Sequence, residues 1–251
     1  MPAKKSPAEI GDALYIDTSD DEAAMQVIRA TVLSLWDAVD NLSRIRPRRA
    51  DAYYVTIFGS ARIRPNTTFY REVRKLAQEL AQLGCRIVTG GGPGLMQAAN
   101  AGAHDANPDD PEASVGVRID LAHEQRTNAF VGQAYRHRTF FSRLHNFVWM
   151  SNAFIVVPGG IGTLLELSMI WQLLQVQKLY NTPLIAVGSM WKDLQDWATS
   201  HMVDAKLHLA DRVDMTIPVC VDTMDEALEL IRNHHRFWKH GAPSPPRRPR
   251  V

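Results

Sequence analysis

The segment FIVVPGGIGTLLE, residues 154–166, decides the fold class. Its first four residues form the apolar, β-branched run of a buried strand, and the residues after position 161 follow an apolar helical period. A proline and three glycines lie at the junction, as expected where a strand ends in a tight loop and a helix begins. The same order of strand, glycine loop and helix occurs twice within residues 53–104. The sequence therefore predicts repeated β-α units.

Short β-branched runs alternate with helical periods over most of the chain. This alternation predicts the α/β class, with a Rossmann-like, doubly wound parallel sheet and helices on both of its faces. The predicted strands are Tyr53–Phe58, Arg86–Thr89, Val115–Ile119, Phe154–Val157, Leu184–Val187 and Met215–Val219. Helices are predicted at about Thr68–Leu83 and Met96–His104. Right-handed crossovers bring the loops that follow the strands to one edge of the sheet, where such proteins bind ligands.

The length of 251 residues suits one large α/β domain, and no repeat or linker divides the chain. We expect a flexible start at residues 1–19, an N-terminal amphipathic helix with its connection at 20–50, one α/β domain at 51–240 and a disordered Pro- and Arg-rich tail at 241–251. The apolar face of the N-terminal helix comprises Ile28, Val32, Leu35, Trp36, Val39 and Leu42. This face could pack against the main domain or against another subunit.

Composition excludes several classes of function. Lys and Arg number 28 against 27 Asp and Glu, so no global field draws the protein to a polyanion, and we expect no nucleic-acid partner. Cys85 and Cys220 are too few for a disulfide framework or a cysteine metal site, which favours a reducing cytoplasm. No apolar run approaches the roughly 20 residues that span a bilayer, so we expect no membrane partner.

The loop FGSAR, residues 58–62, follows the first predicted strand. Gly59 allows a ligand to approach the backbone closely, and Ser60 offers a hydroxyl group for a hydrogen bond. A tight turn between strand and helix would use the same two residues without any ligand. Gly59 and Ser60 are therefore candidate substrate-binding residues, with the structural alternative left open.

The loop TGGGPGLM, residues 89–96, follows the second predicted strand and leads into a helix. Its glycines expose amide groups, and the helix N-terminus adds roughly half a positive charge, so anions or ribose hydroxyls are natural ligands. The candidate binding residues here are Gly91, Gly92, Gly94 and Met96. The loop does not match the G-x-G-x-x-G dinucleotide fingerprint, which disfavours an NAD enzyme, and it does not match a Walker A loop.

The third loop, PGGIGT at residues 158–163, carries the strongest signal. Gly159, Gly160 and Gly162 can form an amide cradle for a phosphate group, Thr163 can donate a hydroxyl, and the following helix points its positive end at the anion. Glu166 lies about one helical turn further on, where its carboxylate can reach a sugar bound through that phosphate. Alternatively, Glu166 only complements the helix dipole, an effect worth about 0.3 to 1 kcal/mol.

The motifs GGGPGLM at residues 90–96 and PGGIGTLLE at 158–166 resemble the two signatures of the LOG family. Members of this family were long labelled lysine decarboxylases and act as cytokinin riboside 5′-monophosphate phosphoribohydrolases. The resemblance covers about residues 53–230, and two motifs in the correct order make it specific. It implies that Arg143, fifteen positions before Pro158, is an essential residue together with Glu166. It also implies that Glu124 or Gln125 helps to hold the nucleotide.

The chain departs from the family pattern at three positions. Leu144 stands where the family usually has lysine, Leu165 where an acidic residue is common, and Gln97 where longer members tend to have glutamate. None of these differences removes Arg143 or Glu166. They bear on substrate preference and rate.

The resemblance implies hydrolysis of the N-glycosidic bond of a purine nucleoside 5′-monophosphate, giving the free base and ribose 5-phosphate. We expect a small-molecule nucleotide ligand, no cofactor, no metal, and at least a homodimer. Glu166 could stabilise the positive charge that develops on the sugar or activate the attacking water. Arg143 could orient Glu166, or it could contact the departing base or the phosphate.

The sequence bears on three other functions. A nucleotide-binding or sensing protein without catalysis would use the same loops. A pyridoxal phosphate-dependent lysine decarboxylase is disfavoured, because the chain is short for that class and no lysine lies in the glycine motifs. A DNA-binding relative of the fold is disfavoured by the near-neutral charge.

Overall fold

The computed structural model describes residues 21–22, 25–33, 52–119 and 127–241. The chain divides into two compact units, residues 1–47 and 48–251. In the first unit, residues 25–33 form a helix on which Ile28 and Val32 of the predicted apolar face are exposed. The other members of that face lie outside the described residues, as do the predicted flexible start and residues 242–251 of the predicted tail.

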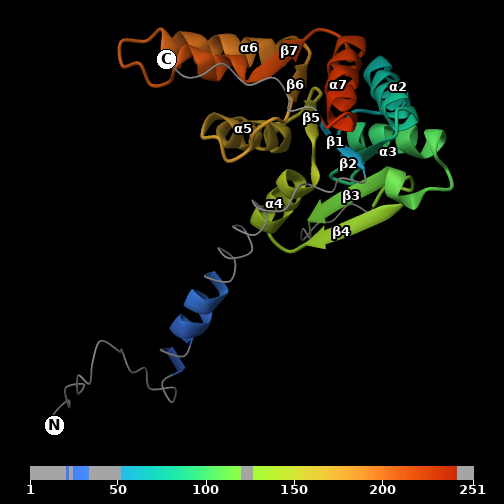
Figure 1. Ribbon diagram of the computed structural model, residues 1–251, viewed down its shortest axis with the longest axis horizontal. Helices are drawn as coiled ribbons and strands as arrows, with labels where there is room; N and C mark the ends of the chain where they lie inside the picture. Colours follow the sequence, from blue (N-terminus) through green and yellow to red (C-terminus); the bar gives the residue numbers. More distant parts are fainter. Residues whose placement is uncertain (1–20, 23–24, 34–51, 120–126, 242–251) are drawn as a thin grey trace. The chain divides into compact units, whose positions relative to one another are not determined.

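The second unit contains a seven-stranded parallel sheet with the strand order β4-β3-β2-β1-β5-β6-β7 (Figure 1). Each neighbouring pair of strands is parallel. The strands are β1 (Tyr53–Phe58), β2 (Cys85–Thr89), β3 (Ser114–Ile119), β4 (Gln133–His137), β5 (Ala153–Val156), β6 (Leu184–Val187) and β7 (Pro218–Val221). The predicted α/β fold with a parallel sheet is confirmed.

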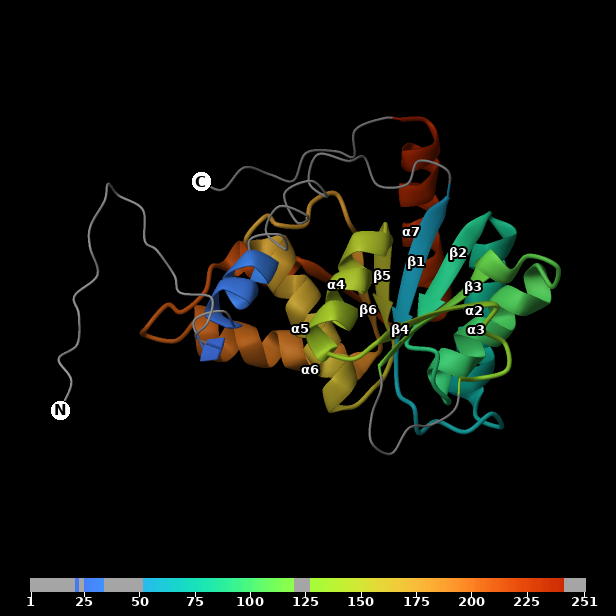
Figure 2. The same ribbon diagram turned by 90° about the horizontal axis from the view of Figure 1, so that it is seen from below.

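Helices cover both faces of this sheet, as Figure 2 shows. One face carries α2 (Thr68–Gln82), α3 (Leu95–Ala106) and α7 (Met224–Lys239). The opposite face carries α4 (Phe140–Met150), α5 (Ile161–Gln175) and α6 (Ser189–Ala198). Each set of helices encloses its own hydrophobic core against the sheet. The arrangement is the doubly wound one that the alternating pattern predicts.

The central strand β1 contributes to both cores. Tyr53, Val55 and Ile57 face α2, α3 and α7, whereas Tyr54 and Phe58 belong to the core on the other face. All six residues of β1 are buried. A strand buried on both sides needs apolar residues at successive positions, which explains why YYVTIF is not an alternating sequence.

The loops at the carboxyl ends of β1 and β5 leave the sheet in opposite directions. After β1 the chain passes to α2 on one face, and after β5 it passes to α5 on the other. Since β1 and β5 are neighbours in the sheet, the strand order reverses between them. Doubly wound proteins bind ligands in the crevice at such a reversal.

Strand β4 was not predicted from the sequence. Its residues, QAYRH, are mostly polar and alternate between half-buried and exposed. It pairs only with β3, at the edge of the sheet, from Val115 opposite Gln133 to Ile119 opposite His137. An edge strand of five residues needs no continuous apolar run, so the apolar pattern used for the other strands does not detect it.

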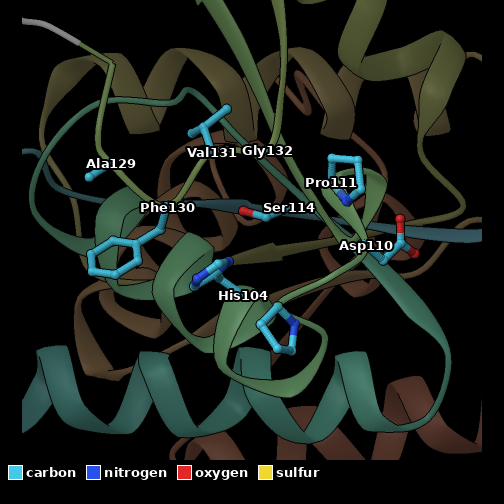
Figure 3. A pocket seen from close by; sticks show the side chains of 9 residues that line it. His104, Asp110, Pro111, Ser114, Ala129, Phe130, Val131 and Gly132 are labelled. Carbon is cyan, nitrogen blue, oxygen red and sulfur yellow. The ribbon is translucent and has the colours of Figure 1, made fainter.

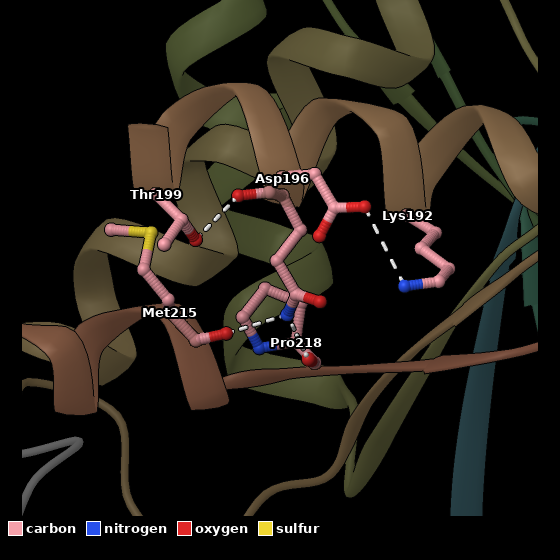
Figure 4. Close-up of polar contacts among 6 residues, drawn as sticks. Lys192, Asp196, Thr199, Met215 and Pro218 are labelled. Carbon is pink, nitrogen blue, oxygen red and sulfur yellow. Dashed lines mark hydrogen bonds and ion pairs between the residues drawn. The ribbon is translucent and has the colours of Figure 1, made fainter. Parts of the chain in front are cut away.

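The predicted boundaries of the last strand were wrong. Residues 215–219 were expected, but β7 begins at Pro218, and Met215 belongs to a short 3₁₀ helix, Arg212–Thr216. The Gln195 side chain of α6 donates hydrogen bonds to the carbonyl oxygens of Met215 and Pro218, at 2.5 and 3.0 Å, and so holds this turn (Figure 4). Proline has no amide hydrogen to give to a sheet, which suits it to the first position of an edge strand.

Candidate active site

The three glycine loops contact one another at the carboxyl edge of the sheet. The amide of Ser60 donates a hydrogen bond to the carbonyl oxygen of Pro158 at 3.1 Å. The carbonyl oxygen of Ser60 accepts one from the amide of Leu95 at 2.8 Å. The first loop therefore joins the second to the third, at the place where the crossover rule puts them.

Close packing between these loops accounts for Gly59 and Gly94. A Cβ atom on Gly59 would lie 2.5 Å from the Val157 side chain. One on Gly94, whose φ is +69°, would lie 2.3 Å from the carbonyl oxygen of Ser60. These two glycines are thus required for the contact between loops. The Ser60 hydroxyl accepts a hydrogen bond from the Arg62 amide at 3.1 Å.

The second glycine loop is covered by two long side chains. A Cβ atom at Gly90 would lie 2.4 Å from Nη2 of Arg143 and 2.8 Å from the sulfur of Met96. At Gly92, a Cβ atom would lie 2.7 Å from the terminal methyl of Met96. The absence of side chains on this loop therefore leaves room for Arg143 and Met96 to lie across it.

The third loop presents an uncapped helix N-terminus. Gly160 is the N-cap of α5, and no side chain caps this helix end. Cβ atoms on Gly160 and Gly162 would meet nothing within 4 Å, so both positions border open space. Gly159 differs, because the Thr163 side chain lies against it, with Oγ1 at 2.2 Å from an added Cβ. Free amides at a helix N-terminus beside open space suit an anionic ligand.

Arg143 and Glu166 form an ion pair between α4 and α5. Nη1 of Arg143 lies 3.2 Å from Oε1 of Glu166, and the two side chains are 13% and 11% exposed. Nε of Arg143 donates a hydrogen bond to the carbonyl oxygen of Val117 at 3.0 Å. Its guanidinium carbon lies 5.2 Å from the centre of the Phe147 ring. Arg143 is therefore fixed from three directions.

Burial shifts the pKa values of both members of the pair. It raises the pKa of Glu166 from 4.5 to about 7, although the charge of Arg143 acts in the opposite direction. Burial also lowers the pKa of Arg143, against the effect of Glu166. A carboxylate that only complements a helix dipole needs neither burial nor a fixed arginine partner. The environment of Glu166 instead places its titration near neutral pH, as is common in active sites.

Three residues outside the glycine motifs lie near this pair or the loops. Asn128 donates hydrogen bonds to the carbonyl oxygens of Gly91 and Gly92. The Arg118 side chain passes beside Gly91. Burial, together with the positive charge of Arg143, lowers the pKa of His137. Glu124 and Gln125 lie outside the described residues.

Two cavities in the described part of the chain differ in their relation to the predicted site residues. One, of about 300 Å³, adjoins the third loop and is lined by Gly159, Gly160, Ile161, Leu164, Met190, Trp191 and Leu194. The other, of about 160 Å³, lies between the end of α3 and residues 129–132 (Figure 3). It is bordered by His104 and Phe130 and includes none of the predicted site residues. The first cavity is thus the one that adjoins the candidate site.

Among residues 21–22, 25–33, 52–119 and 127–241, no cluster of three or more His, Cys, Asp or Glu side chains could hold a metal ion. No helix among these residues is both long enough and apolar enough to cross a membrane.

A family model described as "Possible lysine decarboxylase" matches residues 96–231, more than half of the chain. The chain belongs to the LOG family. The resemblance seen in its two glycine motifs is confirmed. No curated protein matches the sequence.

Solved structures similar to this LOG-family protein share its fold at low sequence identity. The structural genomics target TM1055 is 19% identical, with a TM-score of 0.53 over 72% of this chain and 99% of that one. A molybdenum cofactor binding protein from the phototrophic bacterium Rippkaea orientalis is 20% identical, with a TM-score of 0.51 over 72% and 96%. The molybdenum cofactor carrier protein from Chlamydomonas reinhardtii is 16% identical, with a TM-score of 0.54 over 74% and 99%.

Proposed function

We propose that this protein hydrolyses the N-glycosidic bond of an adenine, or N6-modified adenine, nucleoside 5′-monophosphate. The observation that carries the proposal is the buried pair of Arg143 and Glu166, which lies one helical turn from an uncapped helix N-terminus. A phosphate and a reactive sugar carbon of one nucleotide need two such sites at a short separation. The four steps from Gly162 to Glu166 rise about 6 Å along the helix.

The 5′-phosphate binds at the start of α5. The amides around Gly160 and Gly162, which border open space, take the phosphate oxygens. The second glycine loop, which touches the first loop through Ser60, completes the cleft around the ribose and the base. Binding energy from the phosphate then holds the sugar against Glu166.

The reaction exchanges one bond at the sugar. The bond from the anomeric carbon to the purine nitrogen breaks, its electron pair leaves with the base, and the oxygen of a water molecule bonds to the same carbon. The ionised Glu166 stabilises the positive charge that develops on the sugar and accepts a proton from the water, while the departing base gains one. Arg143 keeps the carboxylate in place through the contact at 3.2 Å.

The test is incubation of the purified protein with AMP and, separately, with isopentenyladenine riboside monophosphate, followed by chromatography of the free bases. We expect adenine or isopentenyladenine together with ribose 5-phosphate. Glu166→Gln should abolish release while largely preserving binding. Glu229→Gln is the matched control, because it removes the same charge from an exposed pair with Arg232. If neither base is released from the unsubstituted protein, the proposal fails for these substrates.

A nucleotide-binding protein without turnover is the second candidate. Two of the similar structures are described as a binding protein and a carrier protein for the molybdenum cofactor, so this fold also serves proteins that hold a ligand. The leucines at positions 144 and 165, beside the ion pair, are compatible with such a role. Tight AMP binding without release of adenine, measured on the same sample, would favour this candidate.

We further propose that a second copy of the chain covers the exposed apolar side chains of α4 and α5. Phe140, Phe141 and Trp149 of α4 are 51%, 68% and 48% exposed, and Ile161 and Leu165 of α5 are exposed as well. A monomer seldom leaves so many large apolar side chains in water. The free cysteines are compatible with a cytoplasmic protein. The mass in solution, measured by light scattering, tests for a dimer or a larger assembly.

A further inference from the structure

The half-buried Asn128 and the buried polar side chains behind it hold the second glycine loop. The backbone amide of Asn128 donates a hydrogen bond to the carbonyl oxygen of Gly91 at 3.0 Å. Its side-chain Nδ2 donates to the carbonyl oxygen of Gly92 at 2.9 Å. Its Oδ1 accepts from the amide of Phe130 at 3.1 Å, which fixes the side chain to its own backbone turn. One residue thus binds two successive carbonyl groups of the loop.

These contacts set the direction in which the loop presents its amides. In a trans peptide, the N–H group points opposite to the C=O group of the same plane. The carbonyl of Gly91 faces Asn128, so the amide of Gly92 points away from it. The amide of Gly91 is already used, because it donates to Oγ1 of Thr89 at 2.9 Å. The backbone amide of Asn128 therefore decides where the Gly92 amide points. The Asn128 side chain binds the carbonyl of the next peptide, whose nitrogen belongs to Pro93 and carries no hydrogen, and so keeps the backbone of Asn128 against the loop.

Asn128 is itself held by Asn100, which is fully buried on α3. Oδ1 of Asn100 accepts hydrogen bonds from Nδ2 of Asn128 at 3.0 Å and from the Thr89 hydroxyl at 2.6 Å. Nδ2 of Asn100 donates to the Ser114 hydroxyl at 2.9 Å and to the carbonyl oxygen of Val115 at 3.4 Å. An amide side chain has two donor and two acceptor positions, so all four are used. The orientation of Asn100 is thereby fixed, and Asn128 must present its donor to the loop.

We infer that Asn128 is a positioning residue for nucleotide binding: it aims the Gly92 amide into the cleft without touching the reacting atoms. The inference rests on the proposed function, because it takes the second glycine loop as part of the nucleotide site. Binding through a backbone amide requires a fixed peptide plane, since the glycines on either side have no conformational preference of their own. Asn128 and Asn100 supply that constraint from outside the loop.

Asn128→Asp is the sharpest substitution, since it keeps the size of the side chain and the acceptor for the Phe130 amide. It replaces the donor with an oxygen that faces two acceptors, the carbonyl of Gly92 and Oδ1 of Asn100. The loop must then move away. Asn107→Asp is the matched control: Nδ2 of Asn107 also donates to a backbone carbonyl, that of Ala81 at 3.4 Å, but at the opposite end of α3.

The first measurement is hydrogen–deuterium exchange of the unliganded full chain. Asn128→Asp should speed exchange at the amides of residues 90–92 by about tenfold or more, whereas Asn107→Asp should leave them within about twofold of the parent. Thermal unfolding identifies any variant that fails to fold. In that case Asn128→Ala, which removes the donor without adding repulsion, takes the place of Asn128→Asp. Unchanged exchange in a folded Asn128 variant would overturn the inference.

The second measurement is AMP hydrolysis and AMP binding. Asn128→Asp should raise KM for AMP about tenfold while kcat stays within about twofold, because Arg143 and Glu166 are untouched. Calorimetric AMP titration in a Glu166→Gln background should show the same loss of affinity without turnover. A loss confined to kcat, or equal losses in the Asn107 control, would overturn the inference. If the parent binds no AMP, both the proposed function and this role fall, whereas the exchange data still report whether Asn128 fixes the loop.

Discussion

Replacing Glu166 with glutamine tests whether a buried carboxylate titrates near neutral pH in this protein. The Glu166 side chain is 11% exposed, and its carboxylate lies 3.2 Å from Arg143. Burial raises its pKa from 4.5 to about 7. The folded protein therefore holds this proton more tightly than the unfolded chain does. It follows that the contribution of Glu166 to stability is complete below pH 4.5 and is lost as the pH rises to about 7.

The size of the effect follows from the two pKa values. A shift from 4.5 to about 7 corresponds to about 3 kcal/mol over the whole titration. Between about pH 5 and about pH 8, the linkage relation gives a loss of about 2.5 kcal/mol in the free energy of unfolding. Glu166→Gln lacks this titration. The stability of the parent relative to the variant should therefore fall by about 2.5 kcal/mol across that interval.

Urea unfolding of both proteins at a series of pH values measures this difference in the free energy of unfolding. The contributions of all other titrating groups are the same in both proteins and cancel in the difference. Glu229→Gln serves as the control, since its exposed carboxylate should give curves parallel to those of the parent. In the same samples, kcat/KM for AMP should rise with pH and level off above about 7, because the ionised carboxylate is the active form. Glu166→Gln should lower kcat about 10²- to 10⁴-fold.

Two results would refute this reasoning. If the unfolding free energies of the parent and Glu166→Gln run parallel between about pH 5 and about pH 8, the carboxylate is already ionised at the lower pH. If kcat/KM is highest at about pH 5 and falls above it, the protonated form is the active one. The first result would mean that burial does not dominate the pKa of Glu166, and the second would mean that the ionised carboxylate is not the active form.

Three further substitutions separate folding from binding. Gly162→Ala should raise the free energy of unfolding by roughly 0.5 to 1 kcal/mol, because alanine favours the helix and its methyl group meets open space. The same substitution should weaken AMP binding. Unchanged AMP affinity in calorimetry would exclude a phosphate beside Gly162. Gly94→Ala should destabilise the fold by roughly 1 to 3 kcal/mol from its positive φ alone, with more from the clash at Ser60, which thermal unfolding would show. Phe141→Asp should reduce the mass in solution to that of one chain while the circular dichroism spectrum is retained, and an unchanged mass would place the subunit contact elsewhere.

Apolar patterning was sufficient to predict the buried strands. The limits of β1 and β6 agree with the prediction, because each strand is a β-branched and apolar run, interrupted only by Thr56 in β1, that is followed by a glycine. The patterning failed at β4, where pairing with one neighbour at the edge replaces burial on both faces. It also failed at the start of β7, where side-chain contacts from α6 set the boundary.

The candidate site was predicted unevenly. Family resemblance gave the pair of Arg143 and Glu166, which are 23 positions apart, and the structure brings them to 3.2 Å. Their roles in catalysis remain a prediction. One support of Arg143, the Phe147 ring, lies one turn further along the same helix, whereas another, the Val117 carbonyl, comes from a strand that only the folded chain brings to α4. The same holds for Asn100, since no local pattern marks one buried asparagine as a fixed point for a loop.

The guanidinium of Arg143 occupies the volume that any side chain at position 90 would need. A relative that keeps the arginine must therefore keep glycine at 90, whereas one with a bulkier residue at 90 must have lost the arginine and must also have moved the side chain at position 96. Comparing only positions 90 and 143 in a sequence alignment of relatives should separate proteins with an intact ion pair from proteins without it. That division could be made before any of the proteins is purified.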